Sequence, residues 1–123
     1  MAEPATVVTL DVYSGRPNPE WTLSDGEVRE LHARLDALSN PLGSQPSRNE
    51  ALGYRGLRVT TQRESKDVEL TVGKGTIAVE SGASAAYYRD TNRQLERWLF
   101  DTGKPKLRPQ LVQSVEQALA KPD

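Results

Sequence analysis

Two polar side chains in a proline-rich segment near the start of the chain, Arg16 and Asn18, are the residues best suited to bind a ligand. The guanidinium of Arg16 offers a planar fork of donors that matches a carboxylate or a phosphate, and the amide of Asn18 offers both a donor and an acceptor. Pro17 and Pro19 fix their own φ angles and hold the residue before each of them in extended geometry. A loop that is stiff in this way loses little conformational entropy when it binds. The segment therefore predicts a recognition loop.

The same segment also has a structural interpretation, in which Trp21 fills the core while the prolines direct the chain into the following helix. The segment resembles one in small uncharacterised bacterial proteins, and the residues that carry the resemblance are Ser14-Gly15-Arg16-Pro17-Asn18-Pro19-Glu20-Trp21. The resemblance covers about nine residues, 13–21, of the 123 and implies no particular activity. Recognition and structural support are therefore both open for this loop.

Arginine neighbours an aromatic residue at three further places, which are Tyr54-Arg55, Tyr88-Arg89 and Arg97-Trp98. Such neighbours can build a surface for stacking and cation–π contacts, although ordinary amphipathic surfaces contain them as well. The first pair lies between Gly53 and Gly56, and flanking glycines indicate that the backbone approaches another segment closely. We therefore expect a small anionic or peptide-like ligand to bind where four side chains converge on one face: Arg16, Asn18, Tyr54 and Arg55.

Patterns typical of catalysis are missing from the sequence. It has no cysteine, no serine in a Gly-x-Ser-x-Gly context and a single histidine, His32, at the boundary between the apolar and polar faces of a predicted helix. Asp11 and Glu20 could form a carboxylate pair across the loop, but nothing in their spacing sets the separation that such chemistry needs. Residues 73–76 lack the full spacing of a phosphate-binding loop and predict a hairpin turn instead. We expect a non-enzymatic protein with no cofactor and no metal site.

The charges are nearly balanced, which narrows the classes of partner. Sixteen basic and seventeen acidic residues leave a net charge of -1, so no overall field attracts nucleic acid or an anionic membrane. The start of the chain has neither the basic region nor the apolar run of a signal peptide, and we expect a cytoplasmic protein. A secreted or periplasmic location stays open if a leader has been removed. The expected partner is a small molecule, a peptide or a protein; a protein–protein adaptor or inhibitor is the alternative function, and nucleic-acid binding is disfavoured.

Alternating apolar residues predict four strands, over residues 7–13, 57–61, 68–72 and 76–80. Residues 81–86 are small and show no pattern. The segment 41–50 is rich in Pro, Gly, Ser and Asn and predicts a mobile surface loop that is too short to separate domains.

Helix-start signals precede three amphipathic stretches. Ser24 and Glu27 have the spacing of a capping box, and the apolar residues that follow predict a helix to about residue 39. Asp90 or Thr91 can cap a second helix, and Pro109 suits the first turn of a third. Together with the strands, these helices predict one α+β domain over residues 1–123, an antiparallel sheet of about four strands with about three helices packed on one face.

Overall fold

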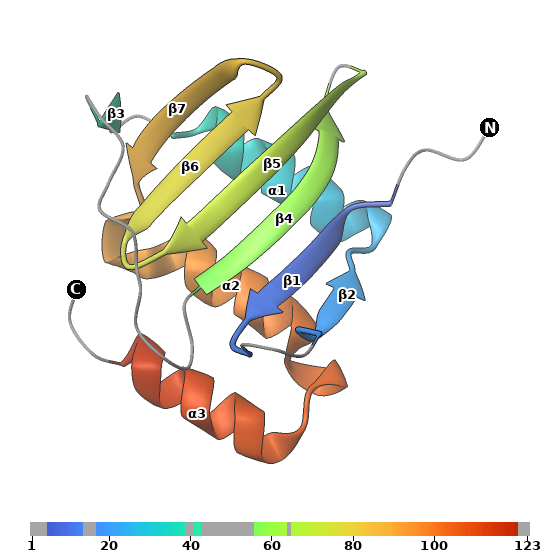
Figure 1. Cartoon of the computed structure of the whole chain (residues 1–123), viewed down its shortest axis with the longest axis vertical. Coiled ribbons are helices and arrows are strands. Elements are labelled where there is room, and N and C mark those ends of the chain that lie inside the picture. The colour runs from blue at the N-terminus through green and yellow to red at the C-terminus, as the bar shows by residue number, and fades with distance from the viewer. Residues whose placement is uncertain (1–4, 14–16, 39–40, 43–55, 64, 121–123) are drawn as a thin grey trace.

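An antiparallel sheet runs through the centre of the protein, with helices against one of its faces (Figure 1). The computed structural model describes residues 5–13, 17–38, 41–42, 56–63 and 65–120. The strand order in the sheet is β2-β1-β4-β5-β6-β7-β3, and each strand is antiparallel to its neighbours. The strands are β1 (Val7–Asp11), β2 (Glu20–Thr22), β3 (Pro41–Leu42), β4 (Gly56–Arg63), β5 (Lys66–Gly73), β6 (Thr76–Ser81) and β7 (Ser84–Arg89).

The helices are α1 (Asp25–Asp36), α2 (Gln94–Gly103) and α3 (Pro109–Leu119), with short 3-10 turns at Thr91–Arg93 and Lys104–Lys106. Figure 1 shows α1 and α2 behind the sheet and α3 below α2. The guanidinium of Arg93 donates to the carbonyl oxygen of Ala118, and that of Arg97 donates to the carbonyl oxygen of Leu119. These two arginines satisfy the last carbonyls of α3 and hold its end against the start of α2. Each helix in the described ranges falls short of the length and apolarity that a membrane crossing requires.

The core lies between the sheet and the helices α1 and α2. Because side chains alternate between the two faces of a strand, the register aligns apolar residues of four strands into two rows on one face. One row is Val8, Val59, Leu70 and Val79, and the other is Leu10, Leu57, Val72 and Ile77. All of them except the partly buried Val79 are at most 1% exposed. The alternation in the sequence was therefore a correct signal for these four strands, and the α+β class is confirmed.

The sheet is larger than the predicted four strands, because it contains seven in the described residues. β7 covers 84–89 and includes part of the segment that showed no pattern; its small residues pair with β6 through the backbone. β2 and β3 have only three and two residues, too few for an alternation to be recognised. Hydrogen bonding to a neighbour that is already formed stabilises such strands without any marked side-chain pattern.

The segment predicted as a mobile loop, 41–50, begins differently from that prediction. Pro41 and Leu42 form β3 and pair with Tyr88 and Tyr87 of β7. The rest of the segment, 43–50, lies outside the described residues.

The predicted start of the first helix is confirmed. The hydroxyl of Ser24 accepts from the backbone N–H of Glu27 at 3.2 Å, and the carboxylate of Glu27 accepts from the backbone N–H of Ser24 at 2.8 Å. Pro109 likewise occupies the first turn of α3. These local signals set where α1 and α3 begin.

Gly56→Ala is expected to lower the free energy of unfolding by about 2–4 kcal/mol, since a strained backbone and a steric clash act together. Gly56 has a φ of +121°, and a Cβ there would lie 2.5 Å from the carbonyl oxygen of Val72. Gly82→Ala is the matched control, because Gly82 has a φ of +58° but no heavy atom within 4 Å of the added Cβ; it should cost only about 1 kcal/mol. Urea unfolding followed by circular dichroism compares the two, and equal losses would contradict a clash at Gly56.

Candidate functional site

Of the four residues that the sequence predicts to bind a ligand, Asn18 lies in the described part of the chain. Its side-chain oxygen accepts from the backbone N–H groups of Val12 and Tyr13, at 3.0 and 2.7 Å. Its amide nitrogen lies 3.5 Å from a carboxylate oxygen of Asp11. The oxygen of Asn18 therefore supports the turn that follows β1. Arg16, Tyr54 and Arg55 lie outside the described residues, so their convergence stays a prediction.

Trp21 has the core position that the structural interpretation of the loop predicts. It is 4% exposed, and its indole Nε1 donates to the hydroxyl of Thr102 at 2.8 Å. The glycine signal at Gly56 is also confirmed, because that backbone passes close to β5. Trp21 therefore packs in the core, and Gly56 allows β4 and β5 to approach closely.

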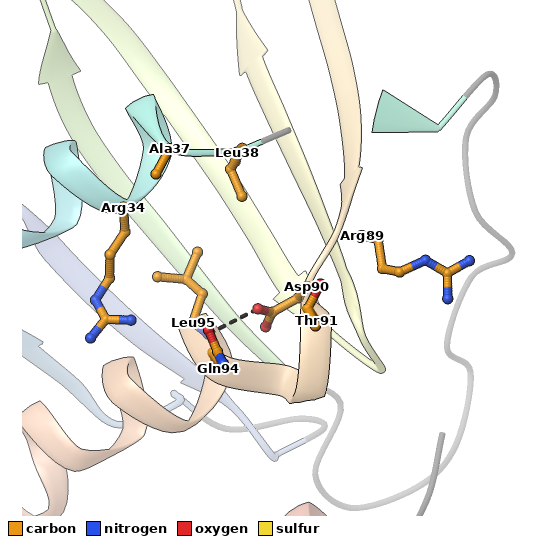
Figure 2. Close-up of a pocket in the computed structure, with 8 residues that line it drawn as sticks. All are labelled: Arg34, Ala37, Leu38, Arg89, Asp90, Thr91, Gln94 and Leu95. Carbon is orange, nitrogen blue, oxygen red and sulfur yellow. Dashed lines mark hydrogen bonds between the residues drawn. The ribbon is translucent and has the colours of Figure 1, made fainter. Parts of the chain in front are cut away.

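A pocket of about 200 Å³ opens between the end of α1 and the start of α2 (Figure 2). It lies where β7 ends, and two segments that are far apart in the sequence, 34–38 and 89–95, meet there. The pocket is lined by Arg34, Ala37, Leu38, Arg89, Asp90, Thr91, Gln94 and Leu95. Apolar side chains form part of the lining, and two arginines, a carboxylate, a hydroxyl and an amide form the rest. The pocket therefore offers both apolar contact and hydrogen-bonding groups to a small ligand.

Arg34, one of the two cations that line the pocket, contacts two neighbouring side chains, Trp98 and Glu30. Its guanidinium carbon lies 5.0 Å from the ring centre of Trp98, a cation–π contact. Its Nε atom is 2.9 Å from a carboxylate oxygen of Glu30, one helical turn earlier. This contact is an ion pair and not a hydrogen bond, because the buried Nε–H of Arg34 has no acceptor in hydrogen-bonding geometry in the described structure. The side chain of Arg34 is therefore restrained by its contacts with Trp98 and Glu30.

Asp90 lines the pocket and caps α2. Its two carboxylate oxygens accept from the backbone N–H groups of Leu95 and Glu96, at 2.9 and 3.0 Å; Figure 2 shows the first of these bonds. Burial raises the pKa of the Asp90 carboxyl above its ordinary value, and the neighbouring charge of Glu96 acts in the same direction, whereas the two amides and Arg93 oppose it. The prediction that Asp90 caps the second helix is confirmed, with a 3-10 turn placed between the cap and α2.

Arg89 lies at the end of β7, on the opposite side of the pocket from Arg34. Its side chain is exposed, and Figure 2 shows its guanidinium pointing away from the end of α1. No ion pair of Arg89 is present within the described residues. Arg89 therefore adds positive charge at the rim, whereas Arg34 lies at the wall of the pocket, over Trp98.

Sequence reasoning missed Arg34, although it did single out Arg89 and Trp98. It considered Arg97-Trp98 as a stacking pair, but adjacent helical residues point in different directions. Arg97 instead donates to the end of α3, and Trp98 receives its cation from α1. The spacing of Glu30 and Arg34, four residues apart, was the available local signal.

The arrangement suits binding of a small anion rather than coordination of a metal. Within the described ranges, no three His, Asp or Glu side chains gather in a way that could hold a metal ion. His32 is partly buried and its Nε2 lies 3.4 Å from the hydroxyl of Thr61, on the sheet side of α1. The residues that line the pocket include two arginines and one aspartate.

Comparisons of the chain with protein-family models, with curated proteins and with solved structures found no match. The geometry of the pocket is therefore the basis for the function that follows.

Proposed function

We propose that this protein is a non-enzymatic binding module that takes a small anionic or peptide-like ligand into the pocket between α1 and α2. The observation that carries the proposal is the position of Arg34, whose guanidinium lies over Trp98 at the pocket wall. A guanidinium in a pocket wall offers several charged donors, and these bind an anionic group strongly. Because contacts with Trp98 and Glu30 already restrict the side chain of Arg34, that side chain would lose little rotamer freedom when a ligand binds.

The other lining groups support the same assignment. Thr91 and Gln94 follow the cap of α2 and bring a hydroxyl and an amide to the pocket, and Arg89 adds positive charge at the rim. Ala37, Leu38 and Leu95 offer the apolar contact that a ligand larger than a simple ion requires. The proline loop with Arg16 remains a second proposed location for the same class of ligand, and Arg16→Ala in the titration below distinguishes the two locations.

Arg34→Met is expected to weaken the binding of anions at least about tenfold, because it keeps the aliphatic stem and removes the charged donors. Nitrogen-15 NMR titrations with acetate, isovalerate, N-acetyl-leucine and inorganic phosphate measure the affinities. The backbone amides of Leu38, Thr91 and Gln94 report whether a probe binds in the pocket. The free energy of unfolding should change by less than about 1 kcal/mol, since a partly exposed ion pair and one cation–π contact are lost.

Arg29→Met is the matched control, since it removes the same charge from an exposed position of α1 that does not line the pocket. It should leave every affinity unchanged. The proposal is wrong if no probe shifts the pocket amides, or if Arg34→Met binds the probes as tightly as the unmodified protein does.

A further inference from the structure

The pocket is small. Its volume of about 200 Å³ lies below the roughly 300–1,000 Å³ of sites for drug-sized ligands, so a compact ligand suits it best.

One part of the lining is apolar. Leu38 points from the end of α1 and Leu95 from the start of α2 into the space between these helices, with Ala37 beside them (Figure 2). Leu95 is 4% exposed and belongs to the core cluster, and Leu38 packs against that cluster. A hydrocarbon group placed here would extend the core instead of displacing water from polar groups, so an aliphatic ligand gains affinity that a fully polar anion does not.

The charges in and around the pocket favour a ligand with one negative charge over a ligand with two. Arg34 and Arg89 line the pocket together with Asp90, and Glu30 pairs with Arg34 from outside the lining. With both carboxylates ionised, these four groups carry no net charge (two positive, two negative), so little positive charge is left to balance a doubly charged phosphate. A single carboxylate, paired with one guanidinium, meets less repulsion from Asp90 and Glu30.

Building on the proposed anion-binding function, we infer that the ligand is a short aliphatic monocarboxylate. Its carboxylate accepts hydrogen bonds from the guanidinium of Arg34, and its hydrocarbon tail packs against Leu38 and Leu95. The planar fork of Arg34 is the geometry that a carboxylate accepts best. A free branched acid and the carboxyl-terminal residue of a peptide share this chemistry. Among the probes, isovalerate represents the free acid and N-acetyl-leucine represents the peptide terminus.

Isovalerate, with a branched tail and one carboxylate, is the test probe. It should bind at least about tenfold more tightly than three comparison compounds: acetate lacks the tail, isovaleramide lacks the charge, and inorganic phosphate lacks the tail and carries more charge near neutral pH. Nitrogen-15 NMR titrations of the full chain follow the backbone amides of Leu38, Thr91 and Gln94. A preference for N-acetyl-leucine over isovalerate would assign the ligand to a peptide terminus and still support a carboxylate site.

Leu38→Ala tests the tail contact separately from the charge. It should reduce the preference for isovalerate over acetate at least about threefold, because the tail loses about one buried methyl contact. The affinity for acetate should stay the same. An unchanged preference in a variant whose spectrum shows a native fold would overturn the inference.

The other outcomes separate this inference from the function on which it rests. If phosphate binds as tightly as isovalerate and needs Arg34, the anion-binding function stands and the monocarboxylate inference is overturned. If isovaleramide matches isovalerate, charge is not recognised and the inference is again overturned. If none of the probes shifts the pocket amides, the binding function and the inference both fail.

Discussion

Glu96→Gln should lower the free energy of unfolding by about 3–5 kcal/mol, because it leaves a buried arginine without its counter-charge. Glu96 is 0% exposed and Arg93 is 7% exposed. The guanidinium of Arg93 binds both carboxylate oxygens of Glu96, each at 2.8 Å. A neutral amide in place of that carboxylate keeps the shape of the side chain but removes the charge that compensates Arg93. Urea unfolding followed by circular dichroism measures the loss.

Glu116→Gln is the control for this change, since Glu116 pairs with Lys104 at 2.8 Å on the surface. Exposed ion pairs contribute little, so its loss should be at most about 1 kcal/mol. The double variant Arg93→Met/Glu96→Leu should recover most of the stability lost in Glu96→Gln, because replacing both charges removes the uncompensated one. A Glu96→Gln variant as stable as Glu116→Gln would contradict a buried, energetically coupled pair.

The second large effect is expected for Trp21→Ala, which should cost about 3–5 kcal/mol as a large-to-small change in the core. Trp21 is 4% exposed and its indole Nε1 donates to Thr102. The ring lies directly over Gly103, where an added Cβ would come within 2.2 Å of a ring carbon. Thermal and urea unfolding measure the loss. Trp98→Ala is the control, because Trp98 is only partly buried and should cost clearly less.

Gly103 allows a test of the same contact from the other side. Gly103→Ala should destabilise the protein by about 1–3 kcal/mol through overpacking against the indole. In the Trp21→Ala background the same change should cost much less, since the ring that it meets is gone. Additive effects of the two substitutions would show that Trp21 and Gly103 do not share this contact.

The residues in these predictions interact with partners at different distances along the chain. The sequence indicated some of these interactions and not others. Trp21 could be recognised as a core residue because a large aromatic precedes a capping box that sets the start of α1. Glu96 could not be recognised as a core residue, because beside Arg97 it resembles a solvent-facing residue of an amphipathic helix. Its burial depends on Arg93, whose left-handed φ of 55° turns the chain just before α2, and on α3, whose last turn covers the pair.

The sequence by itself determined the elements that local chemistry specifies. Alternation gave the four central strands their buried face, Ser24 with Glu27 and Asp90 began two helices, Pro109 began the third, and these sufficed for the α+β class. Each of these signals operates between residues a few positions apart, so it is present before the chain folds.

Only the tertiary structure decided the three further strands and the candidate pocket. β2, β3 and β7 form because a neighbouring strand presents its backbone, which leaves little trace in their side chains. The pocket brings together Arg34 from α1, Arg89 at the end of β7 and Leu95 from α2. The partner of Trp98 is likewise Arg34, 64 positions away in the numbering, and not the adjacent Arg97. Such contacts depend on how the helices pack on the sheet, and no pattern between neighbouring residues encodes that packing.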